Sequence, residues 1–119
     1  MKSRTSRKAG FTLVEIMIVV GIIGLLAAIA IPNFVSARTT SYKNACLNNL
    51  RQIDGAIQQW AVEYKKGPTA TVVETDVTPY LKNAAICPAG GTAFADSYSL
   101  TDVSTHPKCR KVPATHKLP

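Results

Sequence analysis

One stretch of the chain constrains its fold more than any other: an apolar run from Phe11 to Ile31 whose only charged residue is Glu15. As a helix, this run reaches roughly 31 Å, which is about the thickness of the hydrocarbon core of a bilayer. It is apolar on every side, whereas a helix on the surface of a soluble domain keeps a polar face. The run therefore predicts a helix that spans a membrane.

Glu15 is the exception within this run. A carboxylate inside a spanning helix is costly unless it lies near the headgroups or has a partner, so by default it is a candidate functional residue. The alternative is that Glu15, close to the polar N-terminal residues, only reaches the lipid headgroups. Both interpretations fit its position in the sequence.

The distribution of charge predicts the orientation of this helix. The formal net charge is +7, and four of the 14 basic residues lie within the first ten positions: Lys2, Arg4, Arg7 and Lys8. Basic residues beside a spanning helix stay in the cytoplasm, so we expect the N-terminus inside and the C-terminal region outside. The basic segment is too short, and too poor in aromatic residues, to predict nucleic-acid binding.

The junction at Gly10 carries a specific motif. Basic residues, then Gly10, then Phe11-Thr12-Leu13-Val14-Glu15 and an apolar run resemble the leader and processing site of type IV pilins and type II secretion pseudopilins. The resemblance implies cleavage after Gly10 by a prepilin peptidase, N-methylation of Phe11, and pairing of Glu15 with the N-terminal amine of a neighbouring subunit. We therefore expect a leader at 1–10 and a transmembrane and assembly helix at 11–32.

Small residues and a proline mark the rest of this assembly helix. Gly21 is small, and Gly24 and Ala28 have the spacing that lets two helices approach closely in lipid. Pro32 removes a backbone hydrogen bond and is expected to kink or break the helix. The resemblance implies that residues 24–32 lose helicity when a filament assembles; the alternative for an isolated subunit is a gentle kink.

Residues 33–66 predict an amphipathic helix. Its apolar stripe recurs at spacings of three and four residues and consists of Cys46, Leu50, Ile53, Ile57, Trp60 and Tyr64. The sequence Lys65-Lys66-Gly67-Pro68 predicts the end of this helix, with Gly67 as a left-handed cap. The stripe requires a covering layer.

Residues 67–119 are too few to form a core alone, so we expect a small head that packs on the stripe and is cross-linked. Residues 78–81, with Thr78 before Pro79, predict a short helix. Val72 and Val73 predict a strand or loop contacts, segments 93–94 and 98–100 predict a hairpin, and the residues after Arg110 predict a mobile tail. The predicted fold class is α+β and pilin-like, with a long N-terminal helix and a short antiparallel hairpin in the head.

The three cysteines lie in the part expected outside the cytoplasm, where disulfides are permitted. Cys87 with its following Pro-Ala-Gly-Gly, and Cys109 further on, resemble the ending of some small pseudopilin-like proteins. We favour a Cys87–Cys109 disulfide, which the chain-entropy relation values at about 3 kcal/mol. Cys46 either pairs with one of these two cysteines or is a small buried residue.

Motifs for catalysis or a resident cofactor are absent from the sequence: it has no nucleophile motif, phosphate-binding glycine loop or metal-binding helix motif. His106 and His116 lack zinc-finger spacing and no C-x-x-C pair is present, which argues against a structural metal site. Both histidines lie in a polar end segment, which predicts that they are surface residues. Asp96 and Asp102 are weak candidates for calcium, because two acids without a ligand spacing are more often turn residues.

The resemblance implies a structural subunit that polymerises through its N-terminal helix into a type IV pilus or a secretion pseudopilus. Its partners would be copies of itself or related pilins, the prepilin peptidase, an inner-membrane assembly platform and the lipid bilayer. It would lie first in the bacterial inner membrane and then in a periplasmic pseudopilus or a cell-surface pilus. The alternative is a monomeric membrane-anchored binding module. Its DNA contacts would be Lys108, Arg110, Lys111 and Lys117, which no aromatic stacking platform accompanies.

Overall fold

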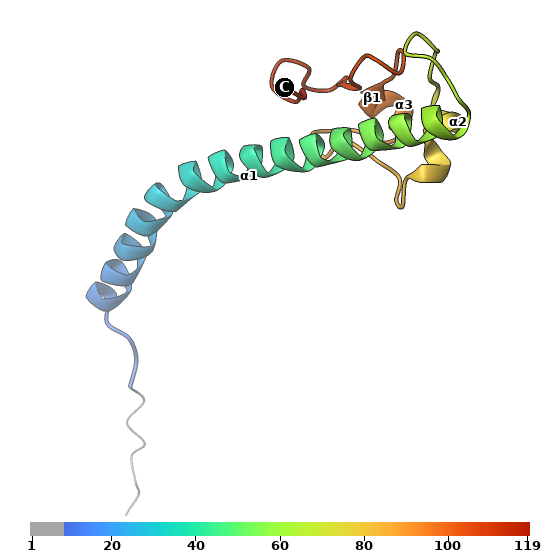
Figure 1. Ribbon diagram of the computed structural model, residues 1–119. Coiled ribbons are helices and arrows are strands. Elements are labelled where there is room, and N and C mark those ends of the chain that lie inside the picture. The colour runs from blue at the N-terminus through green and yellow to red at the C-terminus, as the bar shows by residue number, and fades with distance from the viewer. Residues whose placement is uncertain (1–8) are drawn as a thin grey trace, which may run out of the picture. The chain divides into compact units, whose positions relative to one another are not determined.

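The computed structural model describes residues 9–119, so most of the predicted leader lies outside the described residues. Along the chain the elements are α1 (Leu13–Glu63), α2 (Glu74–Val77), the 3-10 helix η1 (Thr78–Tyr80), α3 (Phe94–Ser97), β1 (Tyr98–Ser99) and β2 (Lys108–Cys109), as Figure 1 shows. The fold is α+β, as predicted. One compact unit ends at Ala37, and a second runs from Arg38 to Pro119.

Helix α1 is 51 residues long and ends three residues before the predicted end at Lys66. Lys65 adopts a left-handed conformation with φ 53°, and the Lys66 N–H donates to the Ala61 carbonyl at 2.8 Å. These two features are those of a Schellman ending, which usually places glycine where Lys65 stands. The prediction that Gly67 caps the helix is therefore wrong. The earlier turn places the Lys66 ammonium 5.8 Å from the centre of the Trp60 ring, where the two attract each other.

Pro32 lies inside α1, and the helix is uninterrupted there. A break at this position, one of the two predicted outcomes, does not occur in the chain by itself. Proline removes only one hydrogen bond of the ladder, and the helical residues on both sides supply the remaining ones.

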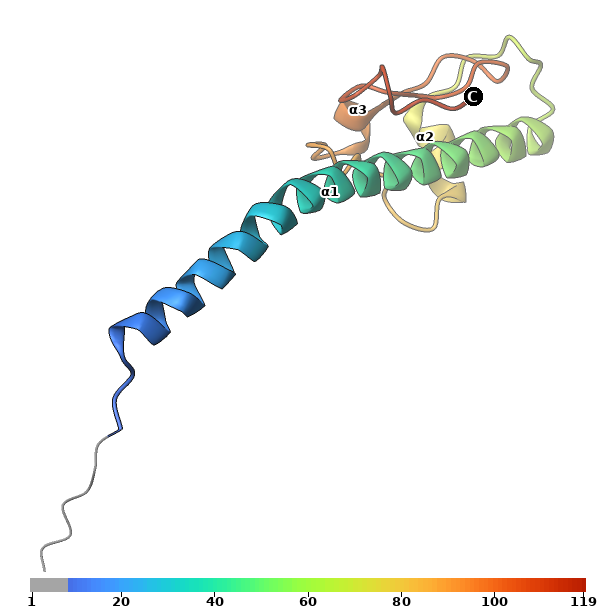
Figure 2. The same ribbon diagram turned by 90° about the vertical axis from the view of Figure 1, so that its left-hand side faces the viewer.

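The apolar stripe of α1 forms the core of the second unit. Cys46, Leu50 and Ile53 are fully buried, and Ile57 and Trp60 nearly so, as predicted. Tyr64 is 59% exposed, so the prediction that it belongs to the stripe is wrong. It lies beyond the end of α1 and no longer follows the helical period. The layer that covers the stripe consists of Val72, Val77, Ala85, Cys87, Phe94, Tyr98, Val103 and Cys109. Figure 2 shows α2 and α3 beside the C-terminal part of α1.

The first half of the head is mostly turns. Thr78 and Pro79 form a 3-10 helix rather than an α-helix, and the Thr78 hydroxyl donates to the Glu74 carbonyl at 2.7 Å. Val72 is buried, and its N–H donates to the Thr101 carbonyl, while Val73 is half exposed. Loop contacts, one of the two predicted alternatives, thus describe this segment.

The antiparallel pair forms with a different partner from the predicted one. Residues 94–97 are helix α3, because the Asp96 carboxylate accepts the N–H groups of Thr92 and Ala93 and so caps a helical turn. Strand β1 pairs instead with β2, in a register that places Tyr98 opposite Cys109. The residues after Arg110 also differ from the prediction of a mobile tail: His116 is 3% exposed and Leu118 packs on the core.

Candidate functional site

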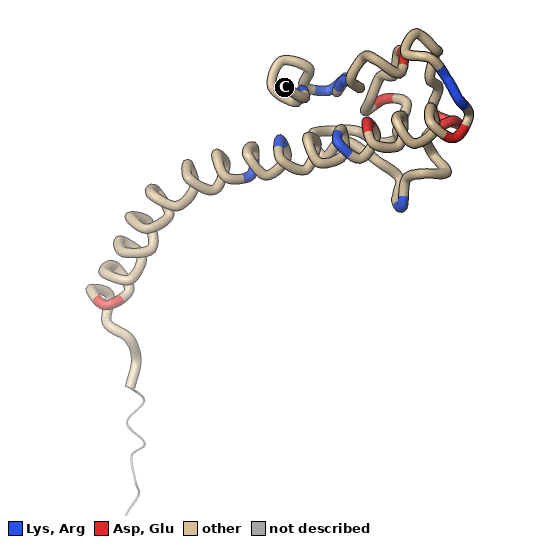
Figure 3. The backbone as a smooth tube through the Cα atoms, viewed as in Figure 1, with Lys and Arg blue, Asp and Glu red and all other residues tan. Residues whose placement is uncertain are grey.

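The first turn of α1 holds Glu15 in a reciprocal pair of hydrogen bonds. The Thr12 N–H donates to Glu15 Oε2 at 3.0 Å, and the Glu15 N–H donates to Thr12 Oγ1 at 3.2 Å. This is a capping box, which satisfies two backbone donors that a helix leaves unpaired at its start. The sequence analysis missed it, although Thr-x-x-Glu is its known signature. Figure 3 shows in red where acidic residues lie, at the start of α1 and in the head.

Gly10 and Phe11 lie just before this turn and outside the helix. Both are exposed, with the Phe11 side chain 85% accessible. The peptide bond between them is therefore within reach of an enzyme. Thr12 and Glu15 both follow Gly10, so a cut after Gly10 leaves the capping box intact.

The apolar half of α1 is exposed in the part of the chain that the structure describes. Its large side chains are exposed from Leu13 to Val35, by between 48% at Ile16 and 77% at Leu13. By length and composition, α1 is the one helix among the described residues that can cross a membrane. Water-soluble proteins rarely expose an apolar surface of this extent, so it requires lipid or other apolar helices.

The predicted small residues of this helix leave open space beside it. A Cβ atom added at Gly21 or Gly24 would meet nothing within 4 Å, and Ala28 and Pro32 are exposed. Gly21, Gly24 and Ala28 are three and four residues apart, so they lie on one face of the helix. The packing of the chain itself does not require their small size. A requirement for small residues at these positions therefore arises only from packing against another molecule.

A second group of chemically active residues lies in the head. The Cys87 sulfur is 3.8 Å from the Cys46 sulfur and 3.6 Å from the Cys109 sulfur, and His116 Nδ1 is 4.0 Å from Cys109 Sγ. All four side chains are buried, and their potential metal-binding atoms lie within 4.8 Å of one another. The prediction that His116 is a surface residue is wrong, because the folded-back C-terminal segment buries it.

The predicted disulfide partners, Cys87 and Cys109, are neighbours in this cluster. The structure contains all three cysteines as free thiols. The Cys87–Cys109 disulfide stays a prediction. His106 is exposed, as predicted, and its Nδ1 lies 3.3 Å from Asp54 Oδ1.

Burial governs the protonation of this cluster. It raises the pKa of Cys46 to about 12 and also raises the pKa of Cys87. Burial acts in the same direction on Cys109, but the Val112 N–H and the neighbouring thiols outweigh it and lower the pKa of this thiol. Burial, followed by the positive charge of Lys43, lowers the pKa of His116, so the imidazole is neutral near pH 7.

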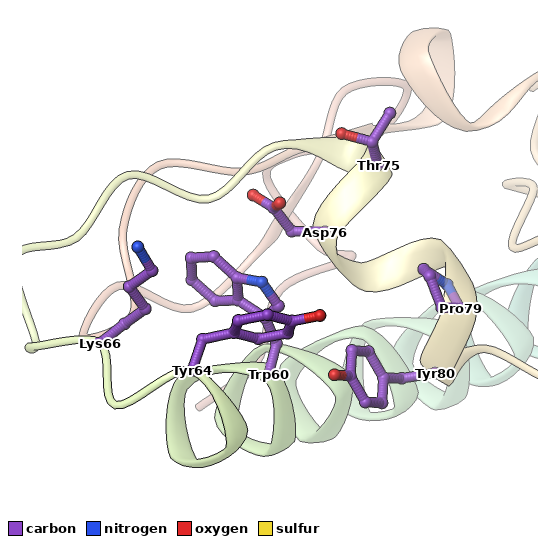
Figure 4. Close-up of a pocket in the computed structure, with 7 residues that line it drawn as sticks. All are labelled: Trp60, Tyr64, Lys66, Thr75, Asp76, Pro79 and Tyr80. Carbon is purple, nitrogen blue, oxygen red and sulfur yellow. The ribbon is translucent and has the colours of Figure 1, made fainter.

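The head also contains an open pocket of about 330 Å³, shown in Figure 4. Two of its polar side chains form hydrogen bonds within the chain: the Asp76 carboxylate accepts the Val73 N–H at 3.1 Å, and the Tyr80 hydroxyl donates to Glu63. The bond to Glu63 raises the pKa of Tyr80 to about 12. These groups are held in structural contacts, and we assign the pocket no reaction.

The two candidate calcium ligands are bound to local donors. The Asp96 carboxylate accepts from Thr92 and Ala93, and Asp102 Oδ1 accepts the Thr105 N–H at 2.7 Å. These bonds lower the pKa of both acids. A calcium site stays a prediction, tested by whether added calcium raises the melting temperature.

The C-terminal basic residues do not act as one free surface. Lys111 Nζ lies 3.5 Å from Asp96 Oδ2, so an acid partly neutralises one of the four proposed DNA contacts. The DNA-binding module stays a prediction, tested by salt-sensitive binding of the chain to DNA.

Comparison with known proteins supplies the family. The prokaryotic N-terminal methylation motif matches residues 5–31. The competence protein ComGC of Bacillus subtilis (strain 168) is 32% identical over 81 residues, which cover 68% of this chain and 82% of ComGC. The chain belongs to the type IV pilin and pseudopilin family.

Other relatives match different lengths of this pilin-like chain. The type IV major pilin protein PilA of Myxococcus xanthus (strain DK1622) is 53% identical over 47 residues, which are 40% of this chain and 21% of PilA. The type II secretion system core protein G of Klebsiella pneumoniae is 30% identical over 91 residues, 71% of this chain and 63% of that protein. The chain thus spans about a fifth of the first relative and under two thirds of the second. No solved structure matches it.

Proposed function

We propose that this chain is a structural subunit of a type IV pilus-like filament or a type II secretion pseudopilus. It enters the inner membrane as a precursor, is cleaved after Gly10, is methylated at Phe11 and polymerises through α1. The observation that carries the proposal is the exposed apolar half of α1, most of which lies within the methylation motif at residues 5–31. Lipid covers this surface before assembly, and the helices of neighbouring subunits cover it afterwards.

Glu15 has the geometry for a contact between subunits. Its Oε2 accepts the Thr12 N–H, so Oε1 can accept a hydrogen bond from a second donor. Cleavage after Gly10 creates a positive amine at Phe11, and a neighbouring subunit presents this amine to Glu15. A charge-assisted bond in a region without water compensates the cost of placing the carboxylate there.

The small residues and Pro32 serve the same assembly. Gly21, Gly24 and Ala28 let adjacent helices approach closely, because they add no bulk to the exposed face. Pro32 removes one bond from the helical ladder, and Gly24 has low helix propensity. Residues 24–32 are therefore the segment that unwinds at least cost when subunits pack.

The test of the Glu15 contact compares two substitutions in cells that contain a prepilin peptidase. Glu15→Ala removes the charge and the cap, whereas Glu15→Gln keeps an oxygen for the Thr12 N–H and removes only the charge. We expect both variants to reach the membrane fraction and neither to appear in sheared filaments. Glu74→Gln, at the start of α2 in the head, is the control and should assemble normally. Normal filaments from Glu15→Gln would contradict a pairing by charge.

Processing has its own measurement. The intact mass of the protein recovered from membranes should match a chain that begins at Phe11 and carries one added methyl group. A chain that still begins at Met1 in cells with an active peptidase would contradict the processing step. Neighbouring genes distinguish the two filament types: a secretin and a secretion apparatus indicate a pseudopilus, and a retraction motor indicates a pilus.

A further inference from the structure

The buried cluster in the head brings together four side chains that lie far apart in the sequence. Cys46 comes from α1, Cys87 from the loop after η1, Cys109 from β2 and His116 from the C-terminal segment. Their exposed fractions are 0%, 1%, 1% and 3% in this order. Three thiols and one imidazole are a ligand set typical of a closed, structural zinc site.

The distances fit a tetrahedral site. Zinc bonds of about 2.3 Å to sulfur and about 2.0 Å to nitrogen give tetrahedral edges of about 3.8 Å between sulfurs and about 3.5 Å between sulfur and nitrogen. The sulfur of Cys87 lies 3.8 Å and 3.6 Å from the other two, and the nitrogen of His116 lies 4.0 Å from Cys109 Sγ. The other pairs of ligand atoms lie within 4.8 Å, so side-chain rotations that shorten these distances by at most about 1 Å give the edges of the tetrahedron. A disulfide would instead require two of the sulfurs to approach to about 2.05 Å.

A single disulfide also leaves half of the cluster without a role. It would use two sulfurs and leave one fully buried thiol beside a buried imidazole. His116 is buried with its Nδ1 4.0 Å from Cys109 Sγ, and imidazole nitrogen is a common metal ligand. One metal ion uses all four groups.

Hydrogen-bond donors face the sulfur atoms of two of the three cysteines. At Cys109 the donor is the Val112 N–H, whose nitrogen lies 3.5 Å from the sulfur. Such donors orient metal ligands and stabilise their charge. At Cys46 the donor is a side chain, the Tyr98 hydroxyl, at 3.7 Å.

Metal binding changes the protonation of the cluster. Binding of Zn²⁺ displaces one proton from each of the three thiols into solvent and leaves the imidazole neutral, so the site carries one net negative charge. Zinc affinity should therefore increase with pH.

We infer that Cys46, Cys87, Cys109 and His116 bind one structural Zn²⁺, which links α1, the Cys87 loop, β2 and the C-terminal segment. Four protein ligands complete the tetrahedron, so the ion has a structural role rather than a catalytic one. The inference does not depend on filament assembly, and its test has no assembly readout.

The first experiment measures the metal content of the full chain, purified from membranes in detergent without added metal. We expect one zinc per chain by elemental mass spectrometry, and three reduced cysteines by alkylation and intact mass. Replacement of zinc by Co²⁺ should give the intense visible absorption of tetrahedral cobalt with thiolate ligands. A chain isolated without zinc and two hydrogens lighter than its reduced mass would overturn the inference, whatever it binds after reduction.

Two variants with one matched control test the ligand set. Cys46→Ser keeps both members of the predicted disulfide, and His116→Asn keeps all three thiols; each should abolish stoichiometric zinc and the cobalt spectrum. His106→Asn changes an exposed histidine of the same head and should bind as the wild type does. Wild-type zinc content in either ligand variant would refute the site. The cobalt spectrum of the unchanged chain decides the question even if a variant fails to fold.

Discussion

Two glycine-to-alanine substitutions should change the stability of the head in opposite directions. A Cβ atom at Gly91 would lie 2.1 Å from Ser97 Oγ and 2.8 Å and 2.9 Å from the backbone O and N of Cys87. Two of these three atoms belong to backbone and cannot rotate away. A Cβ at Gly55, on an exposed position of α1, would meet nothing within 4 Å.

The expected magnitudes follow from these contacts. Overpacking a core site costs about 1–3 kcal/mol. Displacing Ser97 also breaks its bond with the buried Cys87 N–H, 3.0 Å long, and an unsatisfied buried donor costs about 1–3 kcal/mol. Because the two effects overlap, we expect Gly91→Ala to lower the free energy of unfolding by about 2–4 kcal/mol. Gly55→Ala should raise it by about 0.5–1 kcal/mol, since alanine has the higher helix propensity.

Trp60 provides the assay. It is the single tryptophan of the chain and is 7% exposed in the core of the head, so its fluorescence reports unfolding of the second unit even in detergent. For a unit of this size, each kcal/mol shifts the melting temperature by about 4–8 °C. Gly91→Ala should therefore melt at least about 8 °C below the wild type, and Gly55→Ala a few degrees above it. Equal melting of Gly91→Ala and wild type would refute the argument from close packing.

Three further predictions concern the core, the pH dependence and the helix start. Leu50→Ala removes a fully buried side chain and should cost about 2–5 kcal/mol, seen as a lower denaturant midpoint with an unchanged slope. The Ala93 N–H lowers the pKa of Asp96 in the folded chain. The ionised Asp96 carboxylate therefore stabilises the fold above the unfolded pKa of about 3.9, and this stabilisation is lost as the pH falls from there toward the folded pKa. The melting temperature of Asp96→Asn should accordingly depend less on pH below about 4 than that of the wild type. Thr12→Val should accelerate hydrogen exchange at the Glu15 amide, because it removes the capping hydroxyl.

Regular patterns within α1 were predictable because they persist over many residues. The apolar run and the amphipathic stripe each repeat a helical pattern over several turns, and five of the six stripe residues, from Cys46 to Trp60, are buried as predicted. The end of α1 was less predictable. Lys65 adopts a left-handed conformation that propensity assigns to Gly67, and the helix therefore ends at Glu63.

The head depends on contacts that the sequence pattern does not display. Asn49 and Gln58 lie outside the apolar stripe of α1, yet Asn49 donates to the Ile86 carbonyl and Gln58 to the Val103 carbonyl. A polar residue on a helix is ordinarily solvated, and its partner in a distant loop becomes visible only in the folded chain. Asp96 similarly bonds neighbouring backbone and so replaces a predicted strand with helix α3.

The two candidate sites also differ in how far the sequence pattern predicts them. Gly10, Phe11 and Glu15 are adjacent in the chain, so a short motif indicates them. The cluster of Cys46, Cys87, Cys109 and His116 has no local spacing pattern, because its members meet only after the C-terminal segment folds back. The cysteines alone indicated a cross-link, and the buried histidine that completes the ligand set was missed.

The choice between a disulfide and a metal ion determines what holds the head to its helix. A Cys87–Cys109 bond would close a loop within the head and would not link that loop to α1. A metal ion that includes Cys46 links α1 directly to the head, beside the bonds that Asn49 and Gln58 already form. The small head has little core of its own, so a link of this kind adds most where the apolar contacts are fewest. Loss of Cys46 should therefore loosen the head from α1 while the antiparallel pairing of Tyr98 and Cys109 persists. Hydrogen exchange at the Arg110 amide, which donates to the Ser97 carbonyl across the pair, should be equal in Cys46→Ser and wild type. The side-chain amides of Asn49 and Gln58, which bond the head to α1, should exchange faster in Cys46→Ser.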